Sequence, residues 1–361
     1  MRREDHTQDE LFCTISMESL IPADHPLRRI RQRADGALRT LRPKLKAMYA
    51  KVGRPSVPPE RLLRALLLQF LYGYGSERRL MTEMRYNLAF RWFVGLTLSE
   101  EPWDVTVFTK NRKRFLESEL AQQWLKAIVL EARGEGLLDE EHFSVDGTLI
   151  QAWASERSYG PKSDPPPPGQ GTGRRGELLK RDLYESKTDP DARVFRKSFQ
   201  QRWQLGYLGH LVSENRNGLI VASTVTPASK TAERTAATEL IRQVRRLFRK
   251  PGSSSRMTVG ADKAYHEQDF VDAMRRLHVE PHIGAYRRHR VDMVGAAVRE
   301  TAEYRDSQRE RKWIERCFSW LKAPGRQRRT SFRGLPKVDW SFTFAAGVYN
   351  LLRLTKLAPG A

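Results

Sequence analysis

Cysteine is scarce in this sequence: the 361 residues contain two, Cys13 and Cys317. Two cysteines so far apart match no zinc-binding spacing and give no disulfide framework, so a reducing cytoplasm fits best. Long apolar runs are missing as well, since none approaches the roughly 18 residues of a membrane-spanning helix. The polar start "MRREDHTQDE" lacks the apolar stretch of a secretory signal. We therefore expect a cytoplasmic protein without a membrane partner.

Acidic residues are too few to balance the basic ones. The chain has 64 Lys and Arg against 43 Asp and Glu, a formal net charge of +21. The basic residues recur along the whole chain, so much of the folded surface should be positive, as in proteins that bind nucleic acid. An anionic membrane surface is the competing partner, but no predicted helix has a clean Lys/Arg-rich interfacial face. The charge therefore favours nucleic acid.

The first third of the chain carries helix signals. Helices are expected over "HPLRRIRQRADGALRTLR", after Ser56 with its following prolines, from Ser76 through "SERRLMTEMRYNLAFRWFVGL", and near Thr106. Short helices with basic outer faces fit a helix-turn-helix-like DNA-binding module, and equally an ordinary bundle with a solvated basic face. The basic residues expected to contact DNA in this part are Arg54, Arg78, Arg79, Lys110 and Arg112.

From residue 142 onward, β-strand signals alternate with helix signals. "HFSVDGTLIQAWA" predicts a strand and turn, and 205–227 predicts a hairpin that turns at Asn217-Gly218. The other expected elements are strands at 256–265 and 279–285, helices at 231–248, 308–322 and 340–357, and a Pro/Gly-rich loop at 159–182. This order predicts a mixed α/β sheet with helices packed against it.

Two aspartates follow similar β-like runs, Asp146 after "FSV" and Asp262 after "TVGA". Either one alone is also a common turn residue. In an open α/β sheet, however, reactive groups gather at the carboxyl ends of strands, so the two carboxylates would converge if these strands are neighbours. They would then offer hard oxygen ligands suited to Mg²⁺ or Mn²⁺.

A third acidic candidate lies in "RERKWIERCFSWLK". At roughly 100° per residue, Arg311, Glu315 and Lys322 share one polar stripe of the predicted helix. A helix docked on the sheet could direct Glu315 towards the two aspartates. The alternative is an exposed helix stabilised by i,i+4 ion pairs such as Arg311–Glu315.

Together these segments resemble the DDE transposases of bacterial insertion sequences. "SVDGT" and "VGADKAY" are similar to the family segments that carry its two aspartates, and "RERKWIERCFSWLK" to the segment with its glutamate. The family has an arginine four positions before that glutamate and a lysine seven after, which Arg311 and Lys322 match. A tyrosine three positions before the arginine is replaced here by Gln308, so the DNA contact given to that tyrosine lacks support. "SKTDPDARVFRK" is also similar to the family segment ahead of the hairpin.

The resemblance implies a fold and a division of the chain. The fold would be an RNase H-like mixed α/β sheet flanked by helices, in a catalytic domain at 136–357. An N-terminal all-α, helix-turn-helix-like DNA-binding domain would occupy 1–125. A large β-rich insertion ahead of the glutamate, found in some members, cannot fit between Asp262 and Glu315.

The resemblance also implies a function, which is DNA cleavage at the ends of an insertion sequence and strand transfer into target DNA. Asp146, Asp262 and Glu315 would be the catalytic residues and would bind two Mg²⁺ or Mn²⁺ ions. Arg311 and Lys322 would grip phosphate oxygens.

The implied partners are double-stranded DNA, as terminal inverted repeats and as target, and a second copy of the chain, because joining two ends needs two active sites. The protein would then be associated with the bacterial nucleoid. Three alternatives stay open: a non-catalytic DNA-binding protein derived from such an element, an RNase H-like nuclease that cuts and never joins ends, and a structural or membrane-surface protein.

Overall fold

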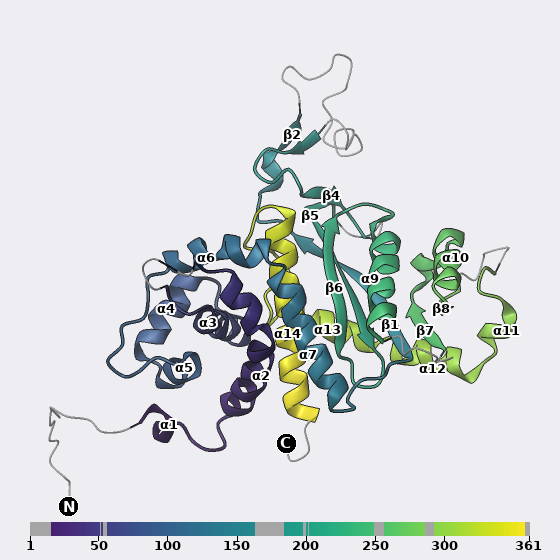
Figure 1. The fold of residues 1–361 in the computed structure, drawn as a ribbon. Helices are drawn as coiled ribbons and strands as arrows, with labels where there is room; N and C mark the ends of the chain where they lie inside the picture. The colour runs from purple at the N-terminus through teal and green to yellow at the C-terminus, as the bar shows by residue number, and fades with distance from the viewer. Residues whose placement is uncertain are drawn as a thin grey trace, which may run out of the picture.

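The computed structural model describes residues 16–50, 52, 56–162, 184–197, 200, 202–248, 256–285 and 292–357. Its helical N-terminal part lies on one side of the long C-terminal helix α14 (Leu335–Leu357), and a mixed sheet lies on the other side (Figure 1). The predicted α/β class and the helical N-terminal region are confirmed. Among the described residues, no helix combines the length and the apolar character required to cross a bilayer.

Seven helices form the described N-terminal part: α1 (Met17–Leu20), α2 (Pro26–Ala47), α3 (Pro59–Leu71), α4 (Glu77–Tyr86), α5 (Leu88–Val94), α6 (Thr106–Glu117) and α7 (Leu120–Gly134). Ser76 caps α4 as predicted, because its hydroxyl accepts from the backbone N–H of Arg79. The single helix expected after Ser76 is wrong. Asn87 takes an extended conformation and caps α5 through Phe90 N–H, so the chain turns between two helices.

The central sheet has the strand order β6-β5-β1-β7-β8. The strands are β1 (His142–Gln151), β5 (Gln204–Glu214), β6 (Ile220–Pro227), β7 (Met257–Ala261) and β8 (Val279–Ile283), and β4 (Arg193–Phe195) pairs with the start of β5. The first three pair antiparallel, whereas β1, β7 and β8 run parallel. This is the RNase H-like arrangement, and the predicted hairpin is its β5–β6 pair.

The segment expected to be a Pro/Gly-rich loop at 159–182 begins as a strand. β2 (Tyr159–Pro161) pairs with β3 (Tyr184–Ser186), and both stand at the upper end of the sheet in Figure 1. The rest of the expected loop, from 163 onward, lies outside the described residues.

Helices cover both faces of the sheet. α9 (Ala232–Phe248) and α10 (Gln268–Arg276) pack on one face, and α12 (Ala302–Glu310), α13 (Trp313–Lys322) and α14 pack on the other; a short α11 (Ala296–Arg299) precedes α12. Along β1, Phe143 meets Phe248 of α9 with ring centroids 5.6 Å apart. Ile150 is seven residues after Phe143, so its side chain points to the other face. There Ile150 and Phe342 of α14 both pack against Gly209. Side chains alternate along a strand, so even-numbered positions of β1 face α12–α14.

The single helix expected at 308–322 is also wrong. α12 ends at Glu310 and α13 begins at Trp313, and the join is a tight turn in which Ile314 N–H bonds to Arg311 C=O. The turn lets α12 pack on β7 and β8 while α13 packs on β1 and α14. Arg311 therefore lies in the turn before α13 and is not part of that helix.

α14 is buried along almost its whole length and joins the two parts of the chain. Phe344 meets Phe70 of α3 at 5.6 Å and Trp124 of α7 at 5.5 Å between ring centroids. On the other side, Asn350 accepts from Ile220 N–H at 2.9 Å and donates to Ile220 C=O at 2.7 Å. One helix thus packs against both the helical bundle and β6.

Candidate active site

Asp146 and Asp262 come together where β1 and β7 separate. The two strands pair in parallel register up to Ser144 and Gly260. Continuing that register by two residues sets Asp146 beside Asp262, the residue directly after β7. The predicted strand end is confirmed for Asp262. It is wrong for Asp146, which lies in the middle of β1 because β5 pairs with the strand on both sides of Asp-Gly.

Gly147 packs closely against neighbouring side chains, although Asp-Gly is a turn signal. A Cβ atom at this position would lie 2.8 Å from Glu233 Oε1 and 3.1 Å from His210 Nδ1. Glu233 is in the first turn of α9, so the glycine lets the helix end approach the strand closely. Asp146 faces the opposite side of the sheet, towards α12 and α13.

Lys197 and Glu233 belong to the site, and the sequence interpretation missed both. The Lys197 ammonium lies 3.3 Å from Asp146 Oδ1 and 3.2 Å from Glu233 Oε1, and it also donates to the carbonyl of Gly147. Lys197 ends the family-like segment at 186–197, which was a usable signal. Glu233 had no sequence signal, because its position in an amphipathic helix predicts only a solvated or paired carboxylate.

The charges of these groups are coupled. Burial raises the pKa of Asp262, and the nearby negative charge of Asp146 raises it further. Glu233 has a raised pKa for the same two reasons, which its ion pair with Lys197 opposes. Burial lowers the pKa of His210 to about 3, with help from the Lys197 charge, so this imidazole is neutral. The centre is therefore rich in carboxylates and has one close ammonium.

Glu315 stands apart from the two aspartates by its exposure. It is an exposed residue in the first turn of α13, and the Arg311–Glu315 ion pair of the alternative interpretation is not among the contacts of the described residues. The described residues also contain no group of three or more His, Cys, Asp or Glu side chains arranged to hold a metal ion. The three-carboxylate assignment thus stays a prediction.

Arg311 and Lys322, on either side of Glu315, do lie near the aspartates. The positive charge of Arg311 acts to lower the pKa of Asp262. Burial lowers the pKa of Lys322, and Lys197 lowers it further while Asp146 opposes the change. Arg311 Nε is buried and has no hydrogen-bond partner among the described residues. These two cations border the carboxylate centre, and Glu315 lies between them in the sequence.

Two family models match this chain. Residues 138–351, more than half of the sequence, match the model described as "Transposase DDE domain". The chain belongs to the DDE transposase family. Residues 15–114 match "Transposase domain (DUF772)", which covers most of the helical N-terminal part of this transposase. No curated protein sequence matches the chain.

Three solved structures are similar to this transposase at low identity. A pre-cleavage Mos1 transpososome is 11% identical over 85% of this chain and 80% of its own, with a TM-score of 0.21. The Mos1 mariner paired-end complex with Mn is 11% identical over 84% and 88%, with a TM-score of 0.22. The Mos1 transposase paired-end complex with left transposon end is 10% identical over 92% and 95%, with a TM-score of 0.21.

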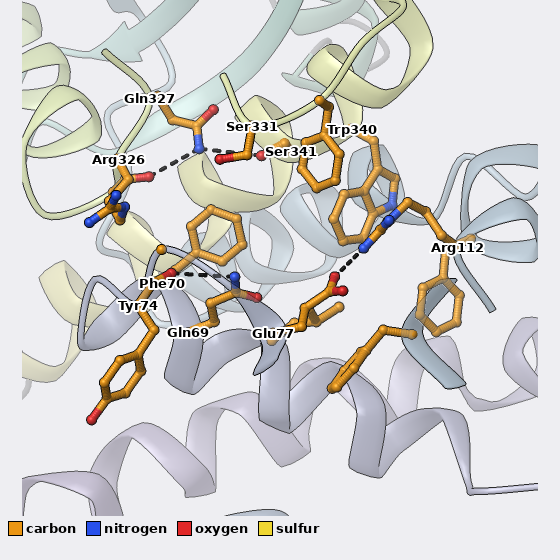
Figure 2. Close-up of a pocket in the computed structure, with 16 residues that line it drawn as sticks. Gln69, Phe70, Tyr74, Glu77, Arg112, Arg326, Gln327, Ser331, Trp340 and Ser341 are labelled. Carbon is orange, nitrogen blue, oxygen red and sulfur yellow. Dashed lines mark hydrogen bonds and ion pairs between the residues drawn. The ribbon is translucent and has the colours of Figure 1, made fainter. Parts of the chain in front are cut away.

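The basic residues expected to bind DNA differ in their surroundings. Arg78 and Arg79 on α4 and Lys110 on α6 are exposed. Arg112 is half-buried, since it pairs with Glu77 and lies 4.8 Å over the Phe332 ring, in the pocket between α3, α4, α6 and the segment before α14 (Figure 2). Arg54 lies outside the described residues. The four described residues remain predicted DNA contacts, and Arg112 is the one already engaged within the chain.

Proposed function

We propose that this transposase cleaves DNA at the ends of its insertion sequence and joins the freed 3′ ends to target DNA. Asp146, Asp262 and Glu315 are the proposed carboxylates, with two Mg²⁺ or Mn²⁺ ions. The observation that carries the proposal is the adjacency of Asp146 and Asp262 on neighbouring parallel strands, inside the segment matched by the DDE model.

Asp146 and Asp262 have the ligand chemistry that suits a divalent cation. Asp146 and Asp262 supply hard oxygen ligands, and the charge of Asp146 raises the pKa of Asp262, as expected of carboxylates that repel each other without a cation. An ammonium group already lies against Asp146 in this structure. Even-numbered residues of β1, Asp146 among them, face the layer of helices to which α13 belongs, and Glu315 lies on α13.

The chemistry needs no co-reactant except water. Water attacks a phosphorus atom at the element's end, the P–O3′ bond breaks, and the leaving oxygen takes a proton to give a free 3′-OH. That hydroxyl then attacks a target phosphorus, forms a new P–O bond and displaces a target 3′ oxygen, which takes up the proton that the hydroxyl loses. Two divalent ions held by Asp146, Asp262 and Glu315 would activate the attacking oxygen and stabilise the leaving one. Arg311 and Lys322 hold non-bridging phosphate oxygens by charge-assisted hydrogen bonds.

The N-terminal helices supply the DNA-binding surface in this proposal. Exposed Arg78, Arg79 and Lys110 contribute to a chain charge of +21, which suits terminal repeats and target DNA. The proposed division is 1–125 for DNA binding and 136–357 for catalysis. α7 runs through the first boundary and ends at Gly134, just before the second part begins. Two copies on DNA provide one active site for each end.

The test is cleavage and joining by purified protein on DNA that carries both ends of the element, with Mg²⁺ or Mn²⁺. Asp146→Asn, Asp262→Asn and Glu315→Gln should each lower cleavage by about 10³-fold, the loss expected when about 4 kcal/mol of transition-state stabilisation is removed. Asp272→Asn on α10 and Glu310→Gln on α12 are matched controls and should cleave normally.

Two outcomes separate this function from its alternatives, and a third tests the assignment of Glu315. Wild-type binding to the ends without any cleavage would mean a non-catalytic DNA-binding protein. Cleavage without a strand-transfer product would mean a nuclease. Normal cleavage by Glu315→Gln, with both aspartate variants inactive, would remove Glu315 from the catalytic set.

A further inference from the structure

Lys197 occupies a cage of oxygen atoms at the carboxylate centre. Its ammonium contacts one oxygen each of Asp146, at 3.3 Å, and Glu233, at 3.2 Å, together with the Gly147 carbonyl. Two carboxylates and a carbonyl form the kind of donor set that a hard metal cation also uses. The Lys197 side chain is 31% exposed, so the ammonium can leave the cage towards solvent.

The charges around the cage explain why a cation is held there. The ammonium lies within 3.3 Å of a carboxylate oxygen of both Asp146 and Glu233, so two negative groups attract one positive group. Removal of the ammonium would leave these carboxylates to repel one another in a partly buried site. The neutral His210 on the α9 side supplies no replacement positive charge.

We propose that Lys197 is a built-in counterion that holds Asp146 in the metal-free enzyme and competes with the divalent cation for its carboxylate. Glu233 is a positioning residue, because it acts on Asp146 through Lys197: its ion pair draws the ammonium towards α9. With a divalent cation bound to Asp146, Lys197 would keep its ion pair with Glu233 and its hydrogen bond to the Gly147 carbonyl. This inference rests on the proposed function, in which Asp146 binds the cation.

The test is Mn²⁺ binding by the full-length, metal-free protein at fixed ionic strength, with free Mn²⁺ followed by electron paramagnetic resonance. Lys197→Met keeps the length of the side chain and removes its charge, so Mn²⁺ should bind at least about fivefold more tightly, the lower end of common coupling effects. In EDTA the same variant should unfold at a lower temperature than wild type, because the carboxylates lose their counterion. Lys197→Arg keeps the charge and should bind Mn²⁺ as wild type does.

Lys187→Met is the matched control, since Lys187 is an exposed lysine of the same segment and the substitution changes the net charge equally. Its Mn²⁺ affinity should not change. If Lys197→Met fails to fold, Lys197→Gln carries the same test and keeps a hydrogen-bond donor for the Gly147 carbonyl. Unchanged or weaker Mn²⁺ binding by the neutral Lys197 variant overturns the counterion proposal.

Glu233→Gln tests the positioning role. It should weaken Mn²⁺ binding in the wild-type background, because Lys197 then rests on Asp146 alone, and it should have no effect in the Lys197→Met background. An equal loss in both backgrounds would make Glu233 a direct ligand and overturn its positioning role.

Asp146→Asn distinguishes a failure of this inference from a failure of the proposed function. If wild type and Asp146→Asn bind Mn²⁺ alike, the proposed metal site fails, and the counterion proposal fails with it. If Asp146→Asn loses Mn²⁺ while Lys197→Met leaves the affinity unchanged, only the counterion proposal fails.

Discussion

The side-chain amide of Gln308 lies 3.4 Å from the carbonyl oxygen of Ala261, the residue directly before Asp262. The same amide nitrogen donates to the carbonyl of His282. These carbonyls belong to the ends of the neighbouring strands β7 and β8. Gln308 therefore fixes the chain that carries Asp262, which gives a physical role to the position where the family signature has a tyrosine.

Gln308→Leu should lower the free energy of unfolding by about 1–2 kcal/mol, because two strand-end carbonyls lose a donor. Cleavage should fall with it, since Asp262 is then less well positioned. Urea unfolding and the cleavage assay measure the two effects. Gln243→Leu, on the partly exposed α9, is the control; wild-type stability and cleavage in Gln308→Leu would rule out a positioning role.

Gly147→Ala should lower the free energy of unfolding by about 1–3 kcal/mol, the usual effect of overpacking. The added methyl would meet Glu233 Oε1 at 2.8 Å and force it away from Lys197. Gly134→Ala is the matched control, because nothing lies within 4 Å of a Cβ there. Equal urea midpoints for the two variants would show that α9 does not need the close approach.

Loss of the Arg112 side chain should reduce stability, whereas loss of the Lys110 side chain should reduce DNA binding. Arg112→Ala breaks a half-buried ion pair with Glu77 and should cost about 1–3 kcal/mol of stability, because Glu77 is left without its partner. Lys110→Ala, at an exposed site, should change stability by no more than about 0.5 kcal/mol. It should instead reduce the salt slope of DNA binding by about one. The reverse pattern, in unfolding and in binding at several salt concentrations, would contradict these placements.

His282 should make the protein less stable in acid. Burial lowers its pKa to about 4 from an ordinary 6.5; Glu280 and Glu303 oppose this shift, while His142 and Arg256 add to it. Above pH 6.5 both folded and unfolded chains leave it neutral. As pH falls from 6.5 to about 4, His282 becomes protonated in the unfolded chain and stays neutral in the folded chain. The free energy of unfolding therefore decreases over this pH range.

His282→Phe should therefore show a shallower loss of stability over that pH range than wild type, measured by urea unfolding at each pH. His278→Asn is the control, since His278 is exposed and its φ of 55° suits asparagine. If the free energy of unfolding of His282→Phe falls in parallel with that of wild type between pH 6.5 and 4, the prediction is wrong.

Local signals were enough to place most elements of the catalytic part. Asn217-Gly218 fixes the hairpin because Gly218 has a φ of 67°, which the turn requires. The break between α12 and α13 was not predictable, since the sequence there has neither glycine nor proline and the turn follows from packing on different strands. Asp146 was placed at a strand end because Asp-Gly is a turn signal, and pairing with β5 overrides it.

The candidate site was predictable only where residues follow a strand or match a family segment. Asp262 and the bordering cations came from such signals. Lys197 ends such a family segment, although its role there was not recognised. Glu233 joins the site through tertiary packing of the first turn of α9 against Gly147, and no periodicity or spacing reports that approach.

α14 packs against both halves of the molecule. Phe344 contacts the helical bundle, and Asn350 is hydrogen-bonded to β6. A chain that ends before residue 335 would lack α14, so both halves would lose their packing against it. Such truncated chains should therefore aggregate or be degraded, and should not persist as a folded fragment.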